Sequence, residues 1–249
     1  MKKFFAHAAL AAAALLSVGA ADASVIDFEN ADLSGAPFAP LLSDWDSVEQ
    51  GPFSIGTYDQ HNRNAPDGKL TGALVDGSNC LDNVCPGGNA TTYLASVNDS
   101  AVFLWDGGTG MKLSSFDAAF LGPVATVTTA AFLVIEADRS DGTFASGYFS
   151  LDINKDGSTS FEHYLVGNAT LFTGGSIYRT GTLTSGDITN LFAYAYYCDS
   201  GSGCSVAATN KGQFGIDNIA VTSVPEPTSW LLMGLGLAGV AAARRRRSA

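Results

Sequence analysis

The chain has 249 residues, of which 46% are hydrophobic and 15% charged, and its formal net charge is −11 at pH 7. This length is sufficient for one domain of ordinary size or two small ones. The two terminal segments, residues 1–23 and 224–249, hold six of the thirteen Lys and Arg residues (Lys2, Lys3 and Arg244–Arg247) and two of the twenty-four Asp and Glu residues. The body between them keeps seven basic and twenty-two acidic residues, a charge of about −15. Such a body repels nucleic acid and anionic lipid, which excludes partners of those classes.

Residues 1–23 have the pattern of a signal peptide. Lys2 and Lys3 form a basic start, the segment 4–20 is almost entirely apolar, and Ala21-Asp22-Ala23 has the small-x-small pattern that a signal peptidase requires. The alternative is an N-terminal membrane anchor, but the many alanines and the cleavage pattern argue against it. We therefore expect a helical signal segment, cleavage by signal peptidase, and export of residues 24–223.

Residues 24–223 contain short apolar segments that are rich in β-branched and aromatic residues and are bounded by turn residues. In FGIDNIAV, for example, Phe214, Ile216 and Asn218 share one face, and such alternation is typical of half-buried strands. The expected strands are residues 24–29, 101–105, 113–121, 130–137, 143–153, 160–166, 176–183, 191–197 and 213–221. This pattern predicts an all-β fold, an antiparallel β-sandwich or jelly roll. Residues 50–88 are polar and weakly periodic, so we expect long loops there with one or two short strands.

The four cysteines, Cys80, Cys85, Cys198 and Cys204, would reach an oxidising compartment after export, where disulfides persist. Each pair lies in a short polar loop, which favours the local pairs Cys80–Cys85 and Cys198–Cys204. Spacing alone leaves the other two pairings open. A four-cysteine zinc site is a further alternative, although the spacings are longer than those of usual zinc knuckles.

The segment LDINKDGSTSFEHY has part of a calcium-loop pattern. Asp152, Asn154 and Asp156 occupy alternate positions before Gly157, and such oxygen ligands suit a hard cation. The pattern then departs, because His163 stands where a calcium loop has Glu. The same residues are also typical of a β-hairpin with its turn at Asn154–Gly157, and the two readings are compatible.

A second candidate calcium site joins the two ends of the body. Asp27 and Glu29 lie in the first expected strand, and Asp217 lies in the last. This arrangement is similar to that of sugar-binding jelly rolls in which an acidic N-terminal strand and an Asp of the final strand hold a structural calcium ion. The alternative is that the three carboxylates are exposed or cap loops.

Motifs of catalysis are weak. After the signal peptide only His61 and His163 remain, and no GxSxG segment accompanies them. Any choice of a carboxylate pair among so many acids is uninformative. The sequence therefore favours a protein that is not an enzyme.

Some aromatic residues could stack on sugars: Trp45, Trp105, Tyr58, Tyr93 and the cluster Tyr194, Tyr196 and Tyr197. Trp45, flanked by acids in an expected loop, is the best exposed candidate, whereas Trp105 ends an apolar strand and is expected in the core.

The C-terminal residues 224–249 have three parts. Pro225-Glu226-Pro227 ends the last strand, residues 228–243 are apolar and would span about 24 Å as a single transmembrane helix, and Arg244, Arg245, Arg246 and Arg247 would stay cytoplasmic. A plain C-terminal anchor would need no more than this. The order of the parts, however, closely resembles the PEP-CTERM sorting signal of Gram-negative bacteria.

The resemblance implies recognition and processing by an exosortase, transient anchoring in the inner membrane, and release to the cell surface or a biofilm matrix of exopolysaccharide. Gln213, Phe214 and Asp217 also resemble a QFxxD subgroup of these proteins, itself of unknown function. The leading hypothesis is an exported surface or matrix protein whose body binds glycan and structural calcium. An extracellular hydrolase acting on matrix polysaccharide and a structural or adhesive component are the alternatives.

Overall fold

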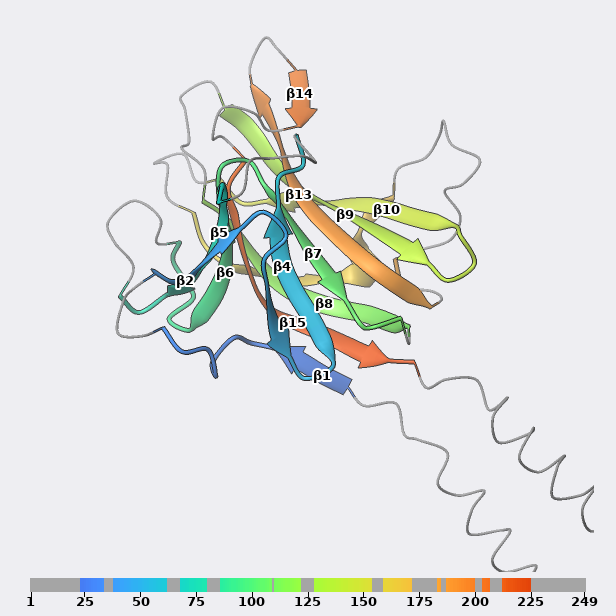
Figure 1. Cartoon of the computed structure of the whole chain (residues 1–249). Coiled ribbons are helices and arrows are strands. Elements are labelled where there is room, and N and C mark those ends of the chain that lie inside the picture. Colours follow the sequence, from blue (N-terminus) through green and yellow to red (C-terminus); the bar gives the residue numbers. More distant parts are fainter. Residues whose placement is uncertain are drawn as a thin grey trace, which may run out of the picture. The chain divides into compact units, whose positions relative to one another are not determined.

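The computed structural model describes residues 23–33, 38–61, 68–79, 86–108, 110–121, 128–153, 159–171, 183–184, 187–199, 203–206 and 212–224 (Figure 1). Within these ranges the regular structure is β-strand, apart from one short 3₁₀ turn, η1 (Val166–Asn168). All the strands belong to one compact unit, Ala23–Ser223. No helix in the described ranges is long and apolar enough to cross a membrane.

The strands pair antiparallel and form two layers. The first layer runs in the order β3 (Ser47–Gln50), β4 (Phe53–Tyr58), β7 (Ala101–Trp105), β13 (Ile188–Asp199), β9 (Thr128–Arg139), β10 (Phe144–Leu151) and β12 (Thr170–Leu171). Strand β14 (Gly203–Val206) pairs with residues 196–199 of β13, beyond residues 190–193, which pair with β7.

The second layer runs in the order β11 (Glu162–Leu165), β8 (Met111–Phe120), β15 (Phe214–Ser223), β6 (Thr92–Ser96), β5 (Leu70–Asp76) and β2 (Phe38–Ser43). Strand β1 (Ala23–Ile26) pairs with the second half of β15. A single pair, Ile188–Met111, joins β13 to β8, so the hydrogen bonding forms one 15-stranded sheet.

The core lies between the layers because strands of both turn alternate residues inward. Leu104 and Leu191 of the first layer and Phe116 and Ile216 of the second are buried in one hydrophobic cluster. A cavity of about 20 Å³ remains among them, room for no more than about one water molecule. Burial of this cluster is the main source of stability of the body.

The predicted all-β class with packed antiparallel layers is confirmed for the described residues. The predicted signal and transmembrane helices lie outside them, as do Pro225, Glu226, Pro227 and Arg244–Arg247. The expected strand 176–183 also falls almost wholly outside. The segment 50–88 contains β4 and β5, in line with the expected one or two strands, although most of β5 is buried.

Several expectations are wrong. Strand β1 ends at Ile26, so Asp27 and Glu29 follow the first strand instead of lying in it. Strands β10 and β11 do not form the predicted hairpin, because β10 pairs with β9 and β12 while β11 pairs with β8 of the other layer. The two strands therefore belong to different layers. Trp105 is not in the core: its side chain is 49% exposed, because Val102 and Leu104 take the inward positions of β7.

Candidate ligand-binding face

The outward side of the first layer is rich in aromatic rings. The same alternation that turns Leu104, Leu133 and Leu191 inward turns aromatic residues outward from five neighbouring strands. We call this set the aromatic face; its half-buried members are Tyr58, Phe103, Phe132, Phe144, Tyr148, Phe192, Tyr194 and Tyr196, and its exposed member is Trp105.

Strand register makes the aromatic face continuous. Phe103 stands opposite Phe192, and Tyr196 stands opposite Phe132. Ring centroids are 5.8 Å apart for Tyr58 and Phe192, and 5.3 Å apart for Phe132 and Tyr148. The rings therefore form a band across β4, β7, β13, β9 and β10, strands that lie side by side in Figure 1.

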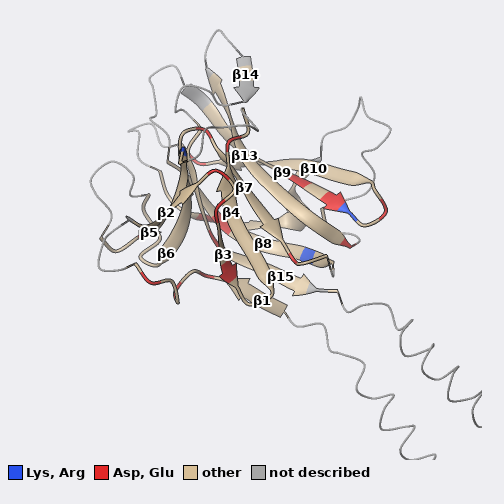
Figure 2. Ribbon diagram, viewed as in Figure 1, with Lys and Arg blue, Asp and Glu red and all other residues tan. Residues whose placement is uncertain are grey.

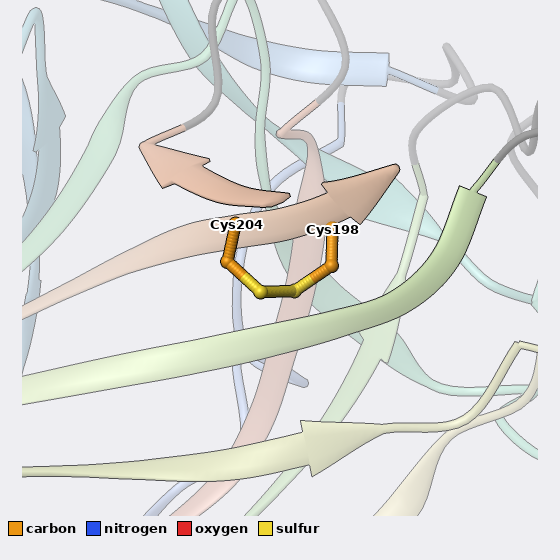
Figure 3. The surroundings of a disulfide bond; sticks show 2 residues. All are labelled: Cys198 and Cys204. Carbon is orange, nitrogen blue, oxygen red and sulfur yellow. A yellow bond between two sulfur atoms is a disulfide. The ribbon is translucent and has the colours of Figure 1, made fainter. Parts of the chain in front are cut away.

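One end of the aromatic face is hollowed. A groove of about 330 Å³ is lined by Phe132, Val134, Tyr148, Tyr196 and Cys204. Cys204 forms the predicted disulfide with Cys198, its direct partner in the β13–β14 ladder (Figure 3). The bond fixes β14 beside the groove. Cys80 and Cys85 lie outside the described residues.

Trp45 extends the band at its other end. Its side chain is 50% exposed and stacks on Tyr58 with ring centroids 4.7 Å apart and an interplanar angle of 17°. Its φ of 67° is in the left-handed region, which is unfavourable for a bulky residue and is found at functional sites.

The turn that carries Trp45 is held firmly. The N–H of Trp45 donates to the carbonyl of Thr57, and the N–H of Asp59 donates to Asp44 Oδ1 at 2.7 Å. Asp59 is buried and pairs with Lys69. An exposed indole in a strained, fixed turn is pre-organised for contact with a ligand.

Polar groups lie within the aromatic face as well as around it. Glu136 stands opposite Phe192 on one side and Ser146 on the other, and its Oε1 accepts a hydrogen bond from the Tyr194 hydroxyl at 2.9 Å. Burial and the Glu136 charge raise the pKa of Tyr194 well above its ordinary value, so the phenol stays a donor. Ser146 is buried, and its Oγ has no hydrogen-bond partner in the described part of the chain.

The carboxylates of the predicted terminal calcium site lie in a second polar cluster. Glu29 Oε1 accepts the N–H of Thr92, and Asp217 Oδ2 accepts the Thr91 hydroxyl and the Asn89 amide at 2.9 and 2.8 Å. Glu29 and Asp217 thus reach the same chain segment at the start of β6, whereas Asp27 accepts the nearby N–H of Glu29.

Asp217 is fully buried. Burial raises the pKa of its carboxyl to about 6, and the Asp117 charge adds to the rise, against hydrogen bonds from Asn89, Asn218 and Thr91 that lower it. Asn218 bridges the two carboxylates, since its amide donates to Asp117 at 2.8 Å.

The second predicted calcium site is described only at Asp152, which is half-buried after β10, because Asn154 and Asp156 fall outside the described ranges. Among the described side chains, no group of three or more His, Cys, Asp or Glu is placed to hold a metal. His163 pairs with Asp117 at 2.7 Å, and its side chain is 59% exposed.

Comparison with known proteins identifies the tail. Residues 223–247 match the family model of the PEP-CTERM protein-sorting motif. The chain carries a PEP-CTERM sorting motif. The motif confirms the resemblance seen in residues 224–249, marks the chain as an exosortase substrate, and implies export to the surface or the extracellular space.

No curated protein matches the chain. Among solved structures, a family 11 carbohydrate-binding module of a Clostridium thermocellum cellulase is 14% identical, with a TM-score of 0.32, over 76% of this chain and 96% of the module. The family 11 module from Clostridium thermocellum in complex with a β-1,3-1,4-mixed-linked tetrasaccharide is also 14% identical, with a TM-score of 0.33, over 78% of this chain and 100% of the module. An agarase is 13% identical, with a TM-score of 0.33, over 76% of this chain and 25% of the agarase. TM-scores this low assign neither fold nor ligand.

Sequence reasoning named Trp45 and four members of the aromatic face, Tyr58, Trp105, Tyr194 and Tyr196, although it expected Trp105 in the core. It missed Phe103, Phe132, Phe144, Tyr148 and Phe192. The signal was present in two places, Phe103-x-Trp105 and Phe192-x-Tyr194-x-Tyr196. These residues alternate with small or aliphatic residues that face the core, so the aromatic positions had to face outward.

Proposed function

We propose that residues 24–223 form a non-enzymatic polysaccharide-binding domain of a cell-surface or matrix protein. The observation that carries the proposal is the continuous aromatic face, with its groove and the fixed, exposed Trp45 at opposite ends. Flat rings offer apolar contact to the C–H faces of sugar rings, and the nearby hydroxyl and carboxylate groups offer hydrogen bonds.

The dimensions of the face favour an extended ligand. The groove volume of about 330 Å³ is within the usual range of ligand sites, and the rings continue from it over several strands. An exposed apolar surface of this kind marks an interaction site in most proteins. A chain of several sugars would contact the groove and Trp45 together.

The sorting motif indicates where in or around the cell the domain would bind its polysaccharide. We infer that signal peptidase removes residues 1–23, that residues 228–243 hold the protein in the inner membrane for a time, and that exosortase then processes the tail near Pro225-Glu226-Pro227. The released domain would attach to exopolysaccharide of the cell surface or biofilm matrix.

Structural calcium remains a proposal for the cluster of Glu29 and Asp217. Both carboxylates contact one segment, and hard cations prefer such oxygen ligands. Binding of calcium would raise the thermal midpoint of the wild-type protein and not that of Asp217→Asn. An equal midpoint in calcium and in EDTA would reject the proposal.

Affinity electrophoresis of the full-length chain in gels that contain single polysaccharides tests the main proposal. Trp45→Ala and Tyr148→Ala each remove one ring, and we expect each to weaken binding about tenfold or more. Leu165→Ala, which shortens an exposed apolar side chain of the other layer, is the matched control. Binding that is insensitive to both ring substitutions would refute the role of the aromatic face.

The hydrolase alternative rests on the pair of His163 and Asp117, which could act as a base and its orienting partner. That pair is on the second layer, away from the aromatic residues of the first. Incubation with bound polysaccharide would release new reducing ends if the alternative were correct, and His163→Ala would abolish the release. Self-association without any polysaccharide binding would instead favour the structural alternative.

A further inference from the structure

We propose that the aromatic face selects an uncharged polysaccharide through Glu136 and Ser146 and rejects acidic polysaccharides. This inference rests on the proposed function and adds the class of ligand. It follows from the charges at the outward positions of the first layer and from one buried hydroxyl group without a partner.

The charge on the face is of one sign. The outward positions of β3, β4, β7, β13, β9 and β10 carry Glu49, Glu136 and Asp138 and, at every outward position that the structure describes, neither Lys nor Arg. Figure 2 shows the same excess of acids over cations across the described strands. A polysaccharide with carboxylate or sulfate groups needs cations for recognition, and this face would repel it.

The polar pair lies inside the aromatic band. Glu136 and Ser146 are direct neighbours across the β9–β10 ladder, with Phe192 on the other side of Glu136. Tyr194 donates to one oxygen of Glu136, and a carboxylate accepts several hydrogen bonds, so acceptor capacity remains for sugar hydroxyls.

Ser146 provides the second observation. Its side chain is 4% exposed, and its Oγ has no hydrogen-bond partner among the described residues. An unpaired buried hydroxyl is costly, and native proteins retain few of them without a reason. Rotation of the Ser146 side chain between its staggered positions would let it share a sugar hydroxyl with Glu136.

The test compares uncharged, anionic and cationic polymers at low ionic strength, where discrimination by charge is greatest. The purified full-length chain is run in gels that contain one of several uncharged polysaccharides (a β-glucan, a xyloglucan, a galactomannan or agarose), alginate, or chitosan. We expect retardation by at least one uncharged polymer and none by alginate. Equal retardation by alginate, or retardation by chitosan alone, would overturn the assignment.

Variants separate this inference from the proposed function. Glu136→Gln keeps the shape and removes the charge, and we expect about tenfold weaker binding to the uncharged polymer. Glu162→Gln is the matched control, because Glu162 also accepts a tyrosine hydroxyl, that of Tyr164, but lies on the other layer. It should bind as the wild type does.

Ser146→Ala guards against an effect of misfolding. Loss of an unpaired buried hydroxyl should leave the thermal midpoint unchanged or raise it, while binding weakens about threefold or more. If Ser146→Ala and Glu136→Gln bind normally while Tyr148→Ala does not, the polar pair has no role and the proposed function stands. If no polymer is bound, the proposed function itself fails.

Discussion

Asp217→Asn changes the buried carboxylate on β15 and so probes the polar cluster at the start of β6. In the native protein, burial and the neighbouring Asp117 charge hold the pKa of Asp217 at about 6, against an ordinary value of 3.8. The folded state thus binds this proton more tightly than the unfolded state does. The carboxyl is compatible with folding when it is protonated and opposes folding when it is ionised.

The sign and size of the effect on the free energy of unfolding follow from the linkage between proton binding and folding. The penalty is absent below pH 3.8, grows as the pH rises, and is complete above pH 6. A shift of about two pKa units corresponds to about 3 kcal/mol, most of which develops between pH 4 and 7. Asn carries no charge at any pH but loses acceptor capacity towards Thr91 and Asn89, a cost that does not depend on pH.

Urea unfolding followed by tryptophan fluorescence, in EDTA at several values between pH 4 and 7.5, measures the difference in free energy of unfolding between wild type and Asp217→Asn. We expect the variant to gain about 2–3 kcal/mol relative to wild type across that range. Asp187→Asn controls for the loss of one exposed negative charge. A difference that is the same at every pH would refute a raised pKa.

Three further outcomes are expected. Replacement of Cys198 and Cys204 by Ser opens a short loop and should lower the free energy of unfolding by about 2 kcal/mol, seen in urea without reductant; an unchanged midpoint would contradict this. Gly56→Ala places a Cβ 2.0 Å from the Asp46 carbonyl oxygen, so it should cost about 1–3 kcal/mol and weaken polysaccharide binding by moving the turn of Trp45; normal stability and binding would show that the turn adapts. Mass spectrometry of the mature protein from an exosortase-positive strain should find Arg244–Arg247 removed, and their retention would exclude processing.

The sequence was sufficient for the fold class because burial in a two-layer structure imposes alternation on many of the strands, such as β7 and β8. The pattern in FGIDNIAV is correct for the first half of β15, where Phe214 and Ile216 lie in the core. It is wrong for the second half, because a register shift after Asp217 places Ile219 and Val221 in the core in place of Asn218. Strand partners were harder to predict from the sequence, since β10 and β11 are neighbours in sequence and yet belong to different layers. Nothing in the local sequence encodes a pairing that is decided by the whole sheet.

The candidate site was predictable only in part. Trp45 was found because its acidic neighbours indicate a loop, but Trp105 was assigned to the core from its apolar context alone. Glu136 and Ser146 gave no local signal, since their proximity depends on the register of β9 and β10. A site built across strands becomes visible only when the register is known.

The position of β15 affects the order of folding. This strand is the last of the body in sequence, yet it lies inside the second layer and pairs with β8, β6 and β1. Contacts between such distant parts of a chain form slowly and late. During export the second layer would therefore lack its shared central strand until residues 214–223 had crossed the membrane. Ser223, the final residue of β15, is also the first residue of the matched sorting motif. Closure of the domain and presentation of the sorting motif would then coincide.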